Sequence, residues 1–257
     1  MPTLDEIAAH LDALLRADEV PDYTNALNGV QVHTGLPIRK VAAAVDLRER
    51  TIHGAVAEGA TLLIVHHGLF WGGLQPLTGA HLRRVRAMLD AGLALYSSHI
   101  PLDLHPTLGN NVLLAHALGL EPTGGFARYK GVEIGVLGDA AIATSELIDR
   151  LRDFAAARGG SVRTSHAAPG RLTTRWAICT GAGASSDTIR EASERGVDTL
   201  IAGEGAHHTA IEAEELGITV IYAGHYATET LGVEALARHV GETFGIPSTF
   251  IDAPTGL

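Results

Sequence analysis

Short apolar runs that alternate with amphipathic segments are the feature of this sequence that most restricts its fold. Three runs rich in aliphatic residues, at 41–45, 61–65 and 93–97, are separated by segments at 48–58 and 79–91 whose apolar residues recur at helical spacing. Strands that alternate with helices build sheets whose faces the helices cover. The sequence therefore predicts an α/β fold with mixed sheets flanked by helices.

The second half of the chain repeats this order of elements. Residues 57–64 (AEGATLLI) resemble 194–201 (ERGVDTLI), and 95–103 (LYSSHIPLD) resemble 221–229 (IYAGHYATE). A duplicated α/β unit explains both matches. Turn residues at 122–125 (PTGG) predict a boundary between an N-terminal unit, 1–125, and a C-terminal unit, 126–257, whose last segments pack back on the first. The elements expected in the second half are strands at 132–137, 174–180, 197–202 and 218–223, and helices at 145–158, 186–195 and 207–216.

Composition narrows the class of protein. A net charge of -10 argues against a nucleic-acid partner, because phosphate backbones are bound by clustered Lys and Arg. The single cysteine, Cys179, allows no disulfide within the chain, which fits a reducing cytoplasm. The N-terminal segment predicts an amphipathic helix with a capping box at Thr3 and Glu6, and no apolar run approaches the roughly 20 residues that cross a bilayer. A soluble cytoplasmic protein with no membrane partner is expected.

Polar side chains that bind metals follow several of the expected strands. Seven of the fourteen histidines fall in four short segments, each after an apolar run, at 66–67, 99–105, 203–208 and 225–229. Two of these segments carry the pattern His, three residues, carboxylate. Because ligands bind beyond the carboxyl ends of strands in open α/β sheets, side chains from these segments can converge on one cleft.

The donor set indicates transition metals. Imidazole and carboxylate together suit Zn, Fe, Mn, Co or Ni. Neighbouring side chains on a regular strand point to opposite faces, but at a strand end that turns through Gly68 both His66 and His67 can point into one cleft, each toward its own ion. Asp103 and Glu229 are the natural bridging carboxylates of a two-metal site. A His-His pair alone is more often a capped loop, so the prediction depends on all of these segments occurring together.

Other polar motifs give weaker evidence for a functional site. His207 and His208 are expected to begin a helix and not to bind metal. Glu204 follows an expected strand, and both a place in the cleft and a place outside it remain open for this residue. The glycine-rich stretches at 108–111 and 181–183 match no phosphate-binding loop and are expected to be turns. A G-x-S-x-G nucleophile elbow is absent from the sequence, which leaves a serine hydrolase unsupported.

Several segments together resemble a known family. NGVQV at 28–32, HHGLFW at 66–71, SSHIPLDLHP with GNN at 97–111, GE at 203–204 and AGHYATE at 223–229 are similar to the short form of the Nif-three-like dinuclear-metal-centre proteins, often named GTP cyclohydrolase I type 2. The resemblance spans nearly the whole chain. It departs at Gly68-Leu69, where many members have a proline, which is expected to alter the turn and not the ligation.

The resemblance implies a toroidal homohexamer of α/β subunits with two divalent metals in each subunit's cleft. The ligands carried over by position are His66, His67, Asp103, His225 and Glu229, with Glu229 bridging. These agree with the residues chosen from the strand ends. His99 matches a family histidine close to the metals, which makes it a candidate for acid/base work or for orienting a ligand.

Two functions remain open from the sequence. The first is a dinuclear-metal-dependent hydrolase acting on a small molecule, with purine nucleotides as the substrate class that the family resemblance implies. GTP cyclohydrolase activity would require a metal-activated hydroxide to attack C8 of guanine. The acidic chain is an unusual host for a triphosphate, although two divalent cations would offset the negative charge locally. Arg128 and Lys130 are further candidates for this, but the sequence does not place them in the cleft. The alternative is a non-catalytic metal-binding or protein-interaction factor.

Overall fold

The computed structural model describes residues 1–257, and the chain forms two compact units. The first unit contains 1–102 and 232–253, and the second contains 103–231 and 254–257. The sequence placed the boundary after residue 125, whereas the chain enters the second unit between Leu102 and Asp103. The physical reason is that Leu114, Leu118 and Leu120, which precede the turn, belong to a buried cluster of the second unit.

The first unit is built on a five-stranded sheet with the order β1-β4-β3-β2-β11. β11, β2, β3 and β4 run parallel, and β1 closes the edge in the antiparallel direction. The chain passes to the second unit at the end of α4 and returns at the start of α10. The elements are α1 (Leu4–Leu15), β1 (Gly29–Val32), β2 (Val41–Asp46), α2 (Glu49–Ala57), β3 (Leu62–His67), α3 (Gly79–Ala91), β4 (Ala94–Ser97), α4 (Ile100–Asp103), α10 (Thr230–Phe244) and β11 (Ser248–Phe250).

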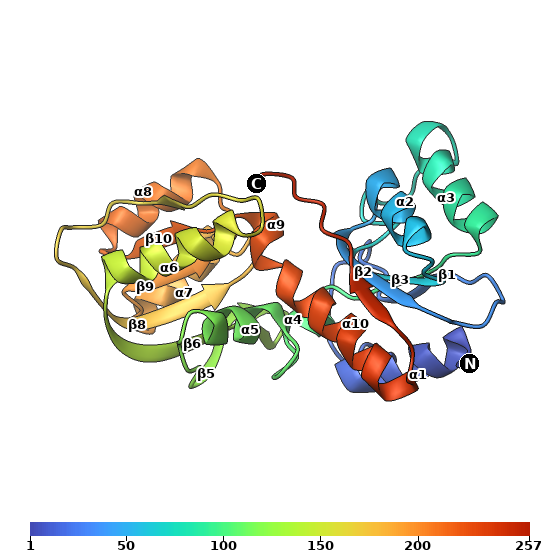
Figure 1. Cartoon of the computed structure of the whole chain (residues 1–257). Helices are drawn as coiled ribbons and strands as arrows, with labels where there is room; N and C mark the ends of the chain where they lie inside the picture. Colours follow the sequence, from blue (N-terminus) through green and yellow to red (C-terminus); the bar gives the residue numbers. More distant parts are fainter. The chain divides into compact units, whose positions relative to one another are not determined.

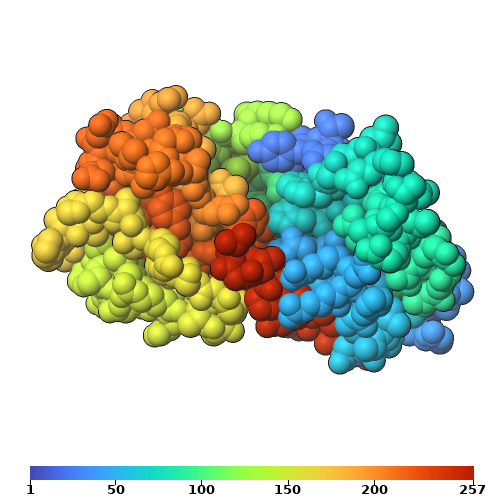
Figure 2. Space-filling model, turned by 90° about the horizontal axis from the view of Figure 1, so that it is seen from above, coloured from blue at the N-terminus to red at the C-terminus, as the bar shows by residue number.

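Both faces of this sheet are covered by helices. The strands at its centre are buried, and alternate residues point to opposite faces, so Ala42 and Leu63 pack against Ile52 of α2 and Met88 of α3. Figure 1 shows α1 and α10 on the other side of the strands. In the view of Figure 2, α2 (light blue) and α3 (teal to green) lie side by side on the surface of this unit.

The second unit contains a six-stranded sheet with the order β5-β6-β8-β9-β10-β7. β8, β9 and β10 are parallel, and the remaining pairs are antiparallel. The elements are α5 (Asn110–Ala117), β5 (Gly124–Tyr129), β6 (Val132–Ala143), α6 (Thr144–Ala156), β7 (Arg163–Thr164), β8 (Leu172–Cys179), α7 (Ser186–Glu194), β9 (Thr199–Ala202), α8 (His207–Glu215), β10 (Thr219–Tyr222) and α9 (His225–Thr228).

Two buried clusters flank the second sheet. Ala177 and Leu200 point toward Ile189 of α7 and Ala213 of α8. Their neighbours in the strands, such as Trp176 and Ile201, point to the opposite face, where α5 and α6 contribute leucines. Buried apolar area of this kind stabilises a fold by about 25 cal/mol per Å². Each unit thus contains a mixed sheet with helices packed on its faces, which confirms the expected α/β fold with two mixed sheets flanked by helices.

The two sheets have the same arrangement of strands at their centres. In each, three successive parallel strands, β2-β3-β4 and β8-β9-β10, are joined by helices, and an antiparallel strand pairs with the last of the three. The strands that matched in sequence, β3 with β9 and β4 with β10, occupy equivalent places in these triplets. No helix of the structure is both long enough and apolar enough to span a membrane.

Some local expectations were wrong. β3 continues through His66 and His67 instead of ending at Val65, and the stretch 108–111 runs into α5 at Asn110 instead of forming only a turn. β5 begins within the expected boundary turn at Gly124. These elements pair with or pack on distant residues, which local pattern does not reveal.

Candidate metal centre

Three histidines gather at the carboxyl ends of β3 and β4 in the first unit. His66 and His67 are the last residues of β3, and His99 follows β4 by two residues. One ring nitrogen from each of the three lies within 4.8 Å of those of the other two, and all three side chains are buried. The ring centroids of His66 and His99 are 4.8 Å apart. The structure thus brings together three of the residues that the sequence predicts at the site.

Each of these histidines has its Nδ1 atom fixed by an acceptor. Nδ1 of His66 lies 2.9 Å from the carbonyl oxygen of Ser98, which can only accept, so Nδ1 carries the proton. Nδ1 of His67 is 2.9 Å from Oδ1 of Asp46, and Nδ1 of His99 is 2.9 Å from Oδ1 of Asp22. In the neutral form of each ring, Nε2 is then the nitrogen with a lone pair. This arrangement is typical of metal-binding histidines, whose other nitrogen donates to a carboxylate or carbonyl.

Asp22 is the most strongly held of these acceptors. Its carboxylate also accepts from Nδ2 of Asn28 at 2.8 Å and from the amide of Ile100 at 2.9 Å. Burial favours the neutral acid, but the hydrogen bonds and the charge of His99 outweigh it, and the pKa of Asp22 lies below its usual value. Asp22 is therefore ionised and fixes the orientation of His99.

A second set of ligand atoms lies in the second unit, after β10. His225 begins α9, and its Nε2 is 3.2 Å from Oε2 of Glu229, one helical turn later. Nδ1 of the same ring is 2.8 Å from Oε1 of Glu204, which follows the end of β9. Glu229 is only 3% exposed. The pairing of His225 with Glu229 places a nitrogen and an oxygen ligand side by side.

Carboxylates determine the charge of this second set. Burial lowers the pKa of His225, but the hydrogen bonds to and negative charges of Glu229 and Glu204 outweigh it and raise that pKa to about 10. Without a metal, His225 is therefore an imidazolium ion between two carboxylates. A divalent cation that replaces this proton meets the same two negative charges, so the donor set fits a metal ion.

Gly181 makes room for Glu229. It follows β8 with φ of +59°, a conformation that favours glycine, and a Cβ atom there would overlap Oε1 of Glu229 and come within 3.3 Å of Nε2 of His225. From the sequence, this glycine was expected only as part of a turn. Only a residue without a Cβ atom therefore allows this carboxylate to approach the backbone so closely.

The remaining predicted residues take different places. Asp103 ends α4, and its Oδ1 accepts from Nδ2 of Asn110 at 2.8 Å; it also lines a cavity of about 250 Å³. Glu204 contacts His225 and, with His207, lines a cavity of about 310 Å³. His207 and His208 are exposed and begin α8, as the sequence predicted.

Three residues of the site, two aspartates and one glycine, were not predicted from the sequence: Asp22, Asp46 and Gly181. Asp46 ends β2, so the rule that polar residues at strand ends mark the site could have found it. Asp22 lies in an irregular segment before β1, and no local pattern distinguishes it. Gly68, expected to turn the chain, is required for another reason: a Cβ atom would overlap the amide of Gln31, whose oxygen accepts from the amide of Leu69 at 2.7 Å.

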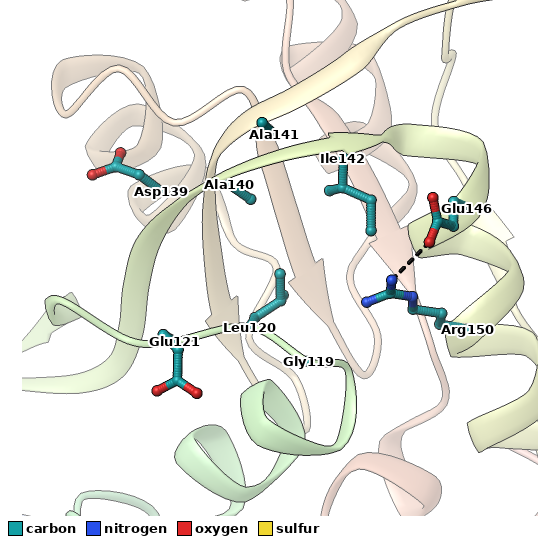
Figure 3. A pocket seen from close by; sticks show the side chains of 9 residues that line it. All are labelled: Gly119, Leu120, Glu121, Asp139, Ala140, Ala141, Ile142, Glu146 and Arg150. Atoms are coloured by element: carbon teal, nitrogen blue, oxygen red, sulfur yellow. Dashed lines mark hydrogen bonds and ion pairs between the residues drawn. The ribbon is translucent and has the colours of Figure 1, made fainter.

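Another cavity of about 370 Å³ is lined by residues 119–121, the second half of β6 and α6 (Figure 3). Glu146 and Arg150 form an ion pair at 2.7 Å on one side, and Asp139 pairs with Arg175 at 2.7 Å. No predicted site residue lines it. Its charged side chains are largely paired, so we assign it no role.

Comparison with known proteins identifies the family. The family model described as Duf34/NIF3 (NGG1p interacting factor 3) matches residues 2–255. The chain belongs to this family. Proteins named GTP cyclohydrolase 1 type 2 homolog are similar along the whole chain: the one from Deinococcus radiodurans is 40% identical over 98% of this chain and 94% of its own, and the one from Pyrococcus abyssi is 41% identical over 98% and 99%.

Solved structures agree with this assignment. A protein titled ybgI, of unknown function, superposes with a TM-score of 0.88 at 32% identity, covering 99% of this chain and 100% of that chain. TTHA1606 from Thermus thermophilus superposes with a TM-score of 0.84 at 38% identity, covering 98% and 99%. The resemblance to the Nif-three-like family is thereby confirmed.

Proposed function

We propose that the chain is a dinuclear-metal-dependent hydrolase of a small molecule. His66, His67, Asp103, His225 and Glu229 are the proposed ligands of two divalent transition-metal ions, with Glu229 bridging. The observation that carries the proposal is the set of histidines whose Nδ1 atoms are held by Ser98, Asp46 and Glu204, so that each ring is oriented and presents Nε2 as its metal-binding atom.

Two of the proposed ligands lie close in sequence to the points where the chain passes from one unit to the other. Asp103 is the first residue of the second unit, and Glu229 precedes by three residues the point where the chain returns to the first. His99 and Asp103 are separated by a single turn of α4. Two proposed ligands are therefore tethered by short stretches of chain to the unit that carries the histidines.

The ligand number favours catalysis over a purely structural role. Closed structural metal sites use four protein ligands for each ion, whereas catalytic sites leave positions open. Five side chains shared by two ions leave such positions. When bound, two divalent ions would lower the pKa of the water attached to them and stabilise the negative charge that develops during hydrolysis.

His99 is the proposed acid/base residue of this chain. Its ring is 4.5 Å from that of Trp71 and is oriented by the ionised Asp22. The fixed Nδ1–H bond leaves Nε2 to hold or give up a proton at the reacting group. Trp71 also contacts His67, with 4.7 Å between the ring centroids. The indole ring of Trp71 therefore borders both histidines and covers part of their surface from bulk water.

The names of the relatives suggest the substrate. Proteins 40% and 41% identical are named GTP cyclohydrolase 1 type 2 homologs, so we propose a purine nucleotide as the first substrate to test. A homohexamer and a cytoplasmic location are further proposals that depend on the family resemblance. The hexamer predicts a particle mass near six times 26.9 kDa.

The test is a screen of the metal-loaded protein against nucleotides, phosphoesters and cyclic amides. A true activity must fall in a Glu229→Gln variant and must survive in Glu234→Gln, an ion-paired surface control on α10. Metal binding without turnover of any substrate would instead favour the non-catalytic interaction factor that the family's description, NGG1p interacting factor 3, names.

A further inference from the structure

Two arginines of the first unit have shielded N–H groups without acceptors. Nε and Nη2 of Arg48 are buried from solvent and have no hydrogen-bond partner, and the same holds for Nε of Arg84. Arg48 directly precedes α2, and Arg84 lies in the second turn of α3. A guanidinium group is charged at any physiological pH, so burying it without a counterion is unfavourable.

Arg84 contacts the peptide that immediately precedes Arg48. Its Nη1 donates to the carbonyl oxygen of Leu47 at 3.3 Å, and this carbonyl belongs to the peptide that joins Leu47 to Arg48. The amide of Leu47 in turn donates to the carbonyl of His67 at 2.9 Å. The side chain of Arg84 and the backbone of Arg48 therefore lie beside the strand end that carries a proposed metal ligand.

Nearby carboxylates are already paired elsewhere. Oδ1 of Asp46 is 2.9 Å from Nδ1 of His67, and Glu49 forms its ion pair with Arg83 at 2.8 Å. Neither acid forms a salt bridge with Arg48 or Arg84. The hydrogen bond from Arg83 and, to a smaller extent, the charge of Arg84 lower the pKa of Glu49, but the shielded N–H groups of Arg48 and Arg84 have no carboxylate acceptor. By contrast, the guanidinium group of Arg195, whose side chain is 23% exposed, forms salt bridges with both Glu133 and Glu191. Such pairing with carboxylates is how a largely buried arginine is usually neutralised.

We propose that Arg48 and Arg84 form the subsite for a phosphoryl group of the substrate. Two guanidinium groups match the charge of a phosphate dianion, and their planar N–H groups suit its oxygens better than a point charge does. The inference rests on the proposed function, because it places an anionic part of the substrate beside the metal ligand His67. It also supplies the positive charge that the acidic chain otherwise lacks.

The test is titration of inorganic phosphate into chelator-treated protein, followed by calorimetry, so that phosphate cannot bind to metal. Hydrogen bonds to a charged group contribute enough that Arg48→Met or Arg84→Met should weaken binding by about 10- to 100-fold. Arg50→Met and Arg86→Met, which remove exposed arginines from α2 and α3, should change it by less than about twofold. Arg48→Lys, which keeps the charge but not the planar group, should fall between.

Thermal unfolding separates this role from a structural one. Without phosphate, Arg48→Met should unfold at the same temperature as the parent or higher, because an uncompensated buried charge is removed. Phosphate should raise the unfolding temperature of the parent and not that of the variant. A large drop in the unfolding temperature of both Arg48→Met and Arg48→Lys without phosphate would make Arg48 a structural residue and overturn the proposal.

Other results would also overturn it: phosphate affinity unchanged in Arg48→Met and Arg84→Met, an equal loss in the Arg50→Met control, or acetate bound as tightly as phosphate. Because the titration needs neither metal nor turnover, it is independent of the hydrolase assay. Arginine-dependent phosphate binding without hydrolysis would refute only the proposed reaction, and hydrolysis without such binding would refute only this subsite.

Discussion

Replacing Asp46 with alanine should weaken metal binding while leaving the fold intact. Asp46 contributes no ligand atom in our proposal; its Oδ1 holds Nδ1 of His67 at 2.9 Å and so keeps Nε2 of that ring directed to the metal. Loss of such an orienting carboxylate typically costs 10- to 100-fold in metal affinity, which is about 1.4 to 2.7 kcal/mol. The side chain of Asp46 is 31% exposed, so water can replace the lost acceptor, and we expect a loss nearer to tenfold.

The assay is competition for Zn²⁺ between the protein and a chromophoric chelator at fixed pH. Asp46→Asn, which keeps an oxygen acceptor, should lose less affinity than Asp46→Ala. Asp90→Ala removes an exposed carboxylate from α3 and serves as the control for net charge. Unchanged affinity in Asp46→Ala, or the same loss in Asp90→Ala, would refute the argument that the Nδ1 contact orients His67.

Three further predictions concern single residues. His99→Ala should lower turnover by about 10² to 10⁴ while metal content stays at the parental level, and loss of metal together with activity would show that His99 is a ligand. Gly181→Ala should reduce both thermal stability and metal content, because its Cβ overlaps Glu229; parental values of both would contradict the close approach. Cys179 should not react with a thiol reagent at pH 8 until the protein unfolds, because burial and then nearby acidic groups raise its pKa to about 12. The native thiol keeps its proton where the unfolded one loses it, so this residue makes stability fall as pH rises from about 9 to 12; rapid native labelling would contradict this.

The regular elements were predictable because their sequence pattern is local. The helix at 79–91 was placed to the residue, since its apolar positions recur at helical spacing and Gly92, with φ of +64°, ends it. α10 was not predicted, although it carries the chain back to the first unit. Long-range pairings such as β11 with β2 join residues some 200 positions apart, and nothing local encodes them.

The candidate site was predictable only where ligand types are rare and grouped. The adjacent histidines at 66 and 67 and the repeated pattern ending at Asp103 and Glu229 stand out in a chain of this composition. The residues that orient them do not: Asp22 is one of 29 acidic residues, and only the fold brings it to His99. Arg48 and Arg84 were likewise ordinary arginines until the structure showed their unpaired nitrogens.

Metal analysis of the purified protein tests the central claim most directly. Elemental analysis should find close to two transition-metal ions per chain, and Glu229→Gln should lose most of both, because a bridging carboxylate serves each ion. The substitution is nearly isosteric, so the fold should persist by circular dichroism. A content near one ion per chain, or two ions retained in the folded Glu229→Gln variant, would contradict a dinuclear centre bridged by Glu229.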